Sequence, residues 1–250
     1  MQENFNNKTD FDTVDGLIIF HHEWEALKNC ASSFRSVYPD GQLFIARDNI
    51  PMKHHNRLAE YAPKFTNTYS TTQFFIDMKF NNESLQDVTN EEFIGKISQD
   101  LARMEETLSQ CKSKYLLYLE ADSKVVSKTI IEEEFDMDSL IANPYPDKVL
   151  QLIKQSSNKD LPISGWGFVT GLIKISSAVR MVEWARKNQE SLLELFNLDR
   201  RFIYLDYFAP ILMHLSGGIV INSGHVGECL RDKSWRNKKY TMLHQYRLDY

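Results

Sequence analysis

The sequence has few cysteines and no long apolar run. Its three cysteines, Cys30, Cys111 and Cys229, are far apart, which argues against a disulfide framework and against a CxxC metal site, and favours a reducing compartment. No stretch approaches the roughly 18 consecutive apolar residues of a membrane span, and the polar N-terminus has no apolar signal segment. We therefore expect a cytoplasmic protein with no transmembrane segment.

An excess of positive charge is also absent. The chain has 29 Lys and Arg against 34 Asp and Glu, a net charge of -5, which argues against nucleic acid as a partner. Hydrophobic residues make up 42% of 250 residues, enough for the core of one large domain. We predict a flexible arm over residues 1–14, a single domain over 15–228 and a basic C-terminal segment over 229–250.

Glycine is missing where two nucleotide-binding classes need it. The segment that follows the first apolar run reads HHEWE, from His21 to Glu25. A dehydrogenase would carry a GxGxxG motif there, and a nucleotidyltransferase would carry a glycine-rich phosphate loop. Both enzyme classes are therefore disfavoured.

The apolar residues that are present predict an α/β fold. Short apolar runs at 16–20 and 43–46 are typical of buried strands, and helical spacing from Glu23 onward, ended by the turn residues 38–41, predicts a helix between them. A strand, a helix and a strand within about 30 residues form a βαβ unit with parallel strands. A ligand crevice is then expected at the carboxyl ends of the strands.

The rest of the chain continues this pattern. We expect a loop-rich connection with one short element over 62–90 and a solvated acidic surface over 132–138. The stretch 162–170 is punctuated by glycines, and after the strand that follows it we expect a helix opened by Ser176 or Ser177. Gly217 and Gly218 should end a later helix. The other predicted elements are a helix over 93–108, a strand over 115–119, a strand over 172–175, a helix over 202–215 and a strand over 219–221.

Two carboxylates end the strand predicted at 115–119. Glu120 and Asp122 flank Ala121, at the edge of the sheet where α/β proteins bind ligands. Carboxylate oxygens suit Mg²⁺ or Mn²⁺, which proteins commonly share with substrate phosphates. The pattern predicts a metal-diphosphate site, and the alternative is an ordinary polar strand end.

A second candidate segment is Gly165-Trp166-Gly167. Glycines allow close approach of the backbone, and an indole face packs well against the C–H face of a sugar ring. Trp166 is therefore a candidate floor for a sugar, with a place in the ordinary core as its alternative.

The order of these motifs resembles nucleotide-sugar-dependent glycosyltransferases of the GT-A fold. The likeness extends from Asp15 to Val226 and includes Arg47-Asp48-Asn49 after the second strand, the DXD-like Glu120-Ala121-Asp122 and an acid on a late helix, Asp206. It implies a Rossmann-like, mixed but mainly parallel sheet flanked by helices. It also implies a nucleotide-sugar donor, with UDP as the first choice and GDP or TDP as alternatives, and a glycan or other hydroxyl acceptor.

The resemblance also assigns roles to individual residues. Asp122 would touch a Mn²⁺ or Mg²⁺ ion directly, with Glu120 beside it, although Glu120 departs from the more common Asp. His225, in the loop after a short strand, matches a third metal ligand, and Asp206 would be the general base if the enzyme inverts configuration. The nucleoside would be held by the residues after the first and second strands, Phe20, His21, His22, Glu23 and Asp48.

The segment from Arg231 to Arg247 is rich in Lys and Arg and has one acid, Asp232. Such a segment can close over a diphosphate and exclude water, in which case Lys233 and Arg236 are candidate phosphate contacts. A solvated tail, a polyanionic acceptor or a membrane face are its alternatives.

These observations lead to one main hypothesis, a metal-dependent glycosyltransferase of glycan biosynthesis. The alternative from another class is a non-catalytic carbohydrate- or nucleotide-binding module, or an inactive GT-A scaffold, because a fold does not guarantee a function.

Overall fold

A computed structural model describes residues 13–20, 24–47, 67–70, 84–139, 143–163, 165–166, 170–228 and 240–244. Its main sheet has seven strands in the order β10-β6-β9-β4-β1-β2-β3. Strand β9 runs antiparallel to both of its neighbours, and every other pair in this sheet is parallel. The predicted mixed, mainly parallel sheet is confirmed.

The predicted βαβ unit opens the domain. Strand β1 (Asp15–Phe20) pairs in parallel with β2 (Leu43–Arg47), and helix α1 (Trp24–Val37) connects them. Strand β3 (Asn67–Ser70) continues this edge. On the other side of β1 lies β4 (Tyr115–Glu120), which is preceded by the 3₁₀ turn η3 (Ser84–Asp87) and the long helix α3 (Asn90–Gln110).

The second half completes the sheet and adds further helices. Strands β6 (Met137–Ser139), β9 (Thr170–Lys174) and β10 (Val220–Ile221) join the main sheet, whereas β7 (Asn143–Pro144) pairs only with β8 (Gly165–Trp166). The helices are α4 (Asp147–Ser157), α5 (Ile175–Lys187), α6 (Gln189–Leu198), the 3₁₀ turn η4 (Arg200–Ile203) and α7 (Leu205–Leu215).

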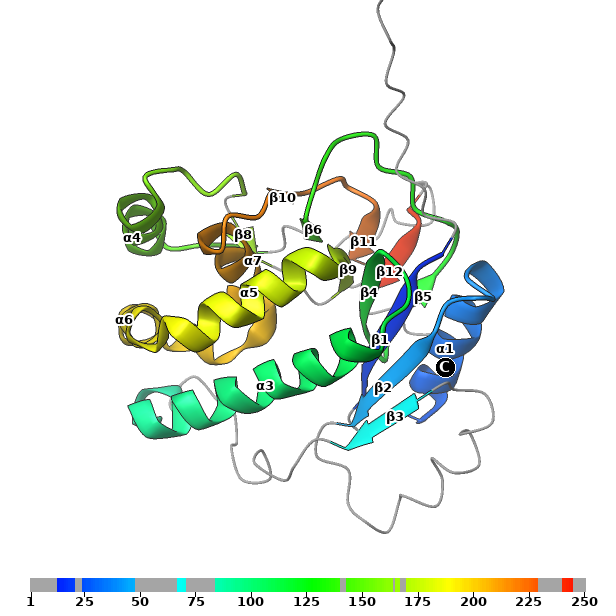
Figure 1. The fold of residues 1–250 in the computed structure, drawn as a ribbon, viewed down its shortest axis with the longest axis horizontal. Coiled ribbons are helices and arrows are strands. Elements are labelled where there is room, and N and C mark those ends of the chain that lie inside the picture. Colours follow the sequence, from blue (N-terminus) through cyan, green and yellow to red (C-terminus); the bar gives the residue numbers. More distant parts are fainter. Residues whose placement is uncertain are drawn as a thin grey trace, which may run out of the picture.

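Helices cover both faces of the sheet, as Figure 1 shows, with α1 on one side and α3 and α5 on the other. Alternate strand residues feed two cores because successive side chains of a strand point to opposite faces. In β4, Leu117 and Leu119 join the core under α1, while Leu116 and Tyr118 join the larger core under α3, α5 and α7.

A second, small sheet ties the C-terminal part of the chain to the middle of the domain. Strand β12 (Met242–His244) pairs in parallel with β11 (Val226–Glu228) and antiparallel with β5 (Lys124–Val125). Residues 242–244 of the predicted basic segment therefore belong to a sheet. The predicted lid stays a prediction because 229–239 and 245–250 lie outside the described residues, as does the predicted arm up to residue 12.

The acidic run was wrongly predicted as solvated throughout. Glu132, Glu133 and Glu134 are exposed, but Asp136 and Asp138 are buried. The reason is that both aspartates accept hydrogen bonds from the chain around β10. Asp136 accepts from the Ile219 N–H at 2.8 Å, and Asp138 accepts from the Ser223 N–H at 2.8 Å. Backbone donors thus offset the cost of burying these charges.

Other boundaries differ by a few residues. Helix α5 begins at Ile175, just before the predicted Ser176 or Ser177, and the predicted helix over 202–215 is η4 followed by α7. Gly217 ends α7 as expected, with a φ of 83° that L side chains rarely adopt, and its N–H bonds to the His214 carbonyl at 2.9 Å. Among the described helices, none is long and apolar enough to span a membrane.

Candidate functional site

A tight turn fixes the two predicted metal-binding carboxylates at the carboxyl end of β4. The Ser123 N–H donates to the Glu120 carbonyl at 3.0 Å, so the chain reverses over Ala121 and Asp122. The buried Ser123 hydroxyl lies 2.6 Å from the hydroxyl of Thr170 in β9. Glu120 and Asp122 therefore stand on a turn that is fastened to the neighbouring strand.

Helix α1 supports the same turn from the other face of the sheet. The Cys30 thiol lies 3.6 Å from the Glu120 carbonyl oxygen, and the Val125 N–H donates to the Ser33 hydroxyl at 3.0 Å. Burial raises the pKa of the Cys30 thiol, and the negative charge of Asp122 raises it further. Cys30 is thus a protonated thiol packed under the turn, and Asp122 lies close enough to α1 to act on it.

Asp206 lies in the first turn of α7, where its side chain is half-buried. Burial raises the pKa of this carboxyl to about 6, and the negative charge of Glu120 raises it as well. The positive charge of Lys96 and hydrogen bonds from the backbone N–H groups of Tyr207 and Asp206 act in the opposite direction. Asp206 therefore lies close enough to Glu120 for the two carboxylates to interact electrostatically.

A buried ion cluster on α3 adjoins these acids and was not predicted from the sequence. Lys96 and Arg103 both contact Asp100, at 2.5 Å and 2.8 Å, and these three side chains are 9% exposed or less. The charges of Arg103, Glu120, Asp100 and Asp206 all act on Tyr118 of β4, although burial is the main reason that its pKa is raised. The cluster therefore lies under the same end of β4.

The spacing of the cluster was a usable signal. Lys96, Asp100 and Arg103 recur at i, i+4 and i+7, and Thr107, which is fully buried, extends the row to i+11. Such a row lies on one face of a helix. Because charged residues on helices usually face solvent, the row was not distinguished from the helix surface.

His225 is the residue before β11. Its carbonyl oxygen accepts from the N–H groups of Thr241 and Met242 at 3.0 Å and 3.2 Å. Burial raises the pKa of the Asp138 carboxyl, and the charge of the His225 side chain lowers it. Because β12 also pairs with β5, the small sheet links His225 to the strand that follows Asp122.

The predicted metal ligands do not form a closed protein cage. Within the described ranges, no three His, Cys, Asp or Glu side chains lie together as a group that could hold a metal ion. Glu120 and Asp122 are hard oxygen donors, which fit a Mg²⁺ or Mn²⁺ ion that takes further ligands from substrate phosphates. A metal at this turn, with or without His225, stays a prediction.

The remaining predicted site residues fall into two groups. Phe20 is fully buried and packs edge-on against Trp24, with ring centroids 4.7 Å apart, so its side chain belongs to the core under α1. The others lie outside the described residues or, for Trp166 in β8, have only their backbone described: His21, His22, Glu23, Asp48, Trp166, Lys233 and Arg236.

Comparisons with known proteins bear on the fold. No family model matches the chain, and no curated protein matches it. A solved active-site mutant of LgtC matches 93% of this chain and 88% of its own, at 13% identity and a TM-score of 0.50. LgtC with donor and acceptor sugar analogues, described as a galactosyltransferase, matches over 92% of this chain and 86% of its own, at 14% identity and a TM-score of 0.49.

The glycosyltransferase GlyE from Streptococcus pneumoniae matches over 94% of this chain, at 10% identity and a TM-score of 0.46, and this chain spans 55% of its length. The LgtC mutant thus matches nearly the whole of this chain, whose main sheet has seven strands. At such identities the likeness concerns the fold and not the reaction. We conclude that this chain has the GT-A fold that glycosyltransferases use.

Proposed function

We propose that this chain is a glycosyltransferase, which moves a sugar from a nucleoside-diphosphate sugar to a hydroxyl group of a glycan or another acceptor. The observation that carries the proposal is the meeting of three acids at one end of the sheet. The turn that holds Glu120 and Asp122 lies at the carboxyl end of β4, and the negative charge of Glu120 raises the pKa of Asp206 in α7. Ligands of open α/β sheets bind at this edge, and the GT-A fold of the chain supports the same assignment.

Asp122 would hold a divalent cation in this proposal, with Glu120 beside it and His225 as a further candidate. When bound, Mn²⁺ or Mg²⁺ would neutralise the charge of the diphosphate. The role of the chain is to keep the turn rigid, which the bond from Ser123 to the Glu120 carbonyl and the contact between Ser123 and Thr170 support.

Asp206 would accept the proton of the acceptor. The acceptor oxygen forms a bond to the anomeric carbon, its O–H proton passes to the Asp206 carboxylate, and the bond to the diphosphate oxygen breaks, so that the nucleoside diphosphate leaves with the electron pair. A pKa of about 6 leaves Asp206 mostly ionised at neutral pH, yet more basic than an ordinary carboxylate. If the enzyme retains configuration, Asp206 would orient the sugar instead.

UDP is our first choice for the nucleotide, with GDP and TDP as alternatives. Lys233 and Arg236 would contact its phosphates, and His21, His22, Glu23 and Asp48 would hold its nucleoside. The cytoplasm remains the expected location. These assignments rest on the sequence.

The direct test is the release of nucleoside diphosphate from UDP-glucose, UDP-galactose, GDP-mannose and TDP-glucose, with Mn²⁺ or with EDTA. We expect one donor to turn over only with metal, and Asp122→Asn to abolish this release. Asp206→Asn should lower kcat about 100-fold or more if Asp206 is the base.

The control is Asp160→Asn, because the Asp160 side chain is 78% exposed and should not affect turnover. Binding of a nucleotide without turnover of any donor would contradict the proposal and indicate a non-catalytic module. Equal turnover by the wild type and Asp122→Asn would contradict the assigned site.

A further inference from the structure

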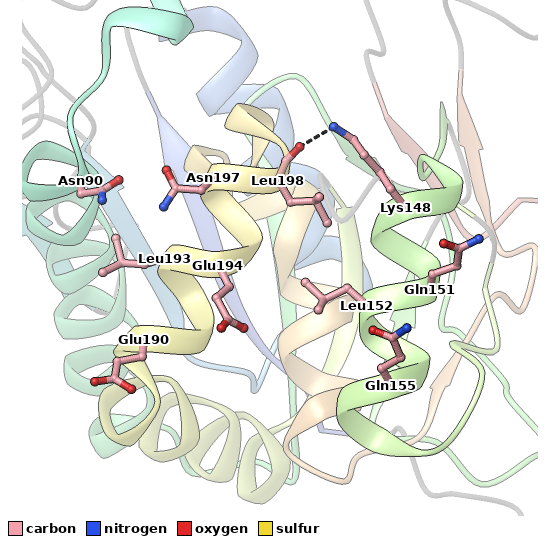
Figure 2. A pocket seen from close by; sticks show the side chains of 10 residues that line it. All are labelled: Asn90, Lys148, Gln151, Leu152, Gln155, Glu190, Leu193, Glu194, Asn197 and Leu198. Carbon is pink, nitrogen blue, oxygen red and sulfur yellow. Dashed lines mark hydrogen bonds between the residues drawn. The ribbon is translucent and has the colours of Figure 1, made fainter.

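A groove between α4 and α6 lies apart from the candidate active site. Its volume is about 810 Å³, and it is lined by both helices and by Asn90 at the start of α3 (Figure 2). A second cavity of about 240 Å³ adjoins it and shares Leu152 and Glu194 with it. Neither cavity includes Glu120, Asp122, Asp206 or His225.

The floor of the groove is apolar and fixed. Leu152 of α4 and Leu193 and Leu198 of α6 are half-buried and pack against the larger core. The half-buried Trp184 of α5 lines the second cavity. Leucine and indole surfaces of this kind can pack against the C–H faces of sugar rings.

The walls of the groove are rich in amides. Gln151 and Gln155 come from α4, Asn197 from α6 and Asn90 from α3, and all four are exposed. Figure 2 shows these side chains around the groove. Within the part of the chain that the structure describes, the side-chain amide groups of these four residues make no hydrogen bond. An amide both donates and accepts hydrogen bonds, which matches the two roles of a hydroxyl group.

The charges of the groove select against anions. Lys148 is its only cation among the described lining residues, and its ammonium donates to the Leu198 carbonyl at 2.6 Å, which joins α4 to α6. Glu190 and Glu194 are exposed on the opposite wall. A phosphate, a nucleic acid or an acidic glycan would be repelled by these carboxylates, and the lysine already donates to a carbonyl oxygen.

We propose that the groove between α4 and α6 binds a neutral oligosaccharide. Its amides would pair with the hydroxyl groups and its leucines would contact the ring faces, as would Trp184 in the adjoining smaller cavity. An amphipathic protein helix fits less well, because such helices need a continuous row of large apolar contacts and amides and carboxylates surround these leucines. The inference does not rest on the proposed transferase activity.

The groove is nevertheless connected to the candidate active site through the fold. Tyr145, two residues before α4, is buried and donates through its hydroxyl to the Tyr207 carbonyl at 2.8 Å. Tyr207 directly follows Asp206, and α4 packs against α7. A glycan held in the groove would thus lie against a helix that contacts the one carrying Asp206.

The test begins with the full chain on a printed array of neutral and anionic glycans, followed by calorimetry with the neutral glycan that binds best. We expect neutral glycans alone to bind. The double variant Gln151→Ala and Gln155→Ala should weaken binding about tenfold, because it removes two hydrogen-bonding groups from exposed positions. Gln155→Arg, which places a long charged side chain in the groove, should weaken it at least as much.

Lys154→Ala is the matched control, because Lys154 is an exposed residue of α4 that does not line either cavity. It should bind like the wild type, and so should Asp122→Ala, whose change tests the proposed transferase site separately. Thermal melting will show whether each variant is folded.

Three results would overturn the proposal. These are the absence of binding to every neutral glycan on the array, binding that both groove variants leave unchanged, and loss by the groove variants of a co-purifying protein while no glycan binds. The last result would identify the groove as a protein interface.

Discussion

Asp206 is the residue whose ionisation connects the structure to a measurable pH dependence. Burial and the charge of Glu120 raise its pKa from an ordinary value of 3.8 to about 6. The folded state therefore binds this proton more tightly than the unfolded state, and Asp206 makes the free energy of unfolding fall as the pH rises from about 4 to about 6. A shift of this size corresponds to about 2–3 kcal/mol.

We predict that Asp206→Asn removes this component. Urea unfolding at a series of pH values should show the variant gaining about 2–3 kcal/mol relative to the wild type between pH 4 and pH 7. Asp160→Asn, at an exposed site, should follow the wild type. A constant difference between Asp206→Asn and the wild type across this range would show that the Asp206 pKa is not raised.

At the residue scale, the sequence predicted those candidates that follow a recognisable element. Glu120 and Asp122 were found because they end an apolar strand, and Asp206 because it opens a helix. The sequence did not predict the cluster of Lys96, Asp100 and Arg103. A row of charged residues on a helix does not indicate that a distant strand will bury it. Asp136 and Asp138 were misjudged for the same reason, since their partners lie about 80 residues further along.

At the scale of elements, α3 contains an ion cluster that its neighbours bury. Asp100 contacts both Lys96 and Arg103. We predict that Asp100→Ala lowers the free energy of unfolding by about 3–5 kcal/mol, because two buried cations lose their shared carboxylate. Chemical denaturation measures the change, and Glu106→Ala, on the exposed side of the same helix, is its control. A loss below about 1 kcal/mol would contradict the assigned role of Asp100.

Asp15 joins three elements at the amino end of β1. Its carboxylate accepts from the N–H groups of Gln42, Lys112 and Ser113, at 2.8 Å, 2.7 Å and 3.0 Å, and from the Ser113 hydroxyl at 3.0 Å. We predict that Asp15→Ala destabilises the fold by about 3 kcal/mol in urea unfolding, because these N–H groups lose their acceptor. Asp40→Ala, at an exposed turn, should change stability little, and equal effects of the two substitutions would contradict this account.

The elements that the sequence predicted are the long ones with a clear apolar stripe. Helix α3 and strands β1, β2 and β4 fall where their patterns place them. Helix α4 was not predicted because only Val149 and Ile153 are fully buried in it. The two-residue strands β5, β7 and β8 exist through pairing with distant segments, which local patterns do not contain.

At the scale of the whole molecule, the small sheet makes the C-terminal part of the chain support the candidate active site. Met242 is fully buried in β12 and lies opposite Val125, three residues after Asp122. We predict that Met242→Asp lowers stability by about 3 kcal/mol or more and weakens nucleotide binding under conditions where the protein stays folded. Calorimetry after circular dichroism would measure both effects.

Ile130→Asp is the matched control for this prediction, because it also replaces a large apolar side chain with a carboxylate but at a position that is 60% exposed. It should leave nucleotide binding and stability near the wild-type values. Retention of full nucleotide affinity by a folded Met242→Asp protein would show that the small sheet does not support the site.

In the proposed function, the turn after β4 binds a nucleoside diphosphate together with a divalent cation. Calorimetric titration of UDP, GDP and TDP, each with Mn²⁺ and with EDTA, into the wild type and Asp122→Ala tests it most directly. We expect one nucleotide to bind at micromolar affinity with Mn²⁺ only, and Asp122→Ala to remove the effect of the metal. Absence of binding by all three nucleotides with Mn²⁺, or equal metal-dependent binding by Asp122→Ala, would contradict it.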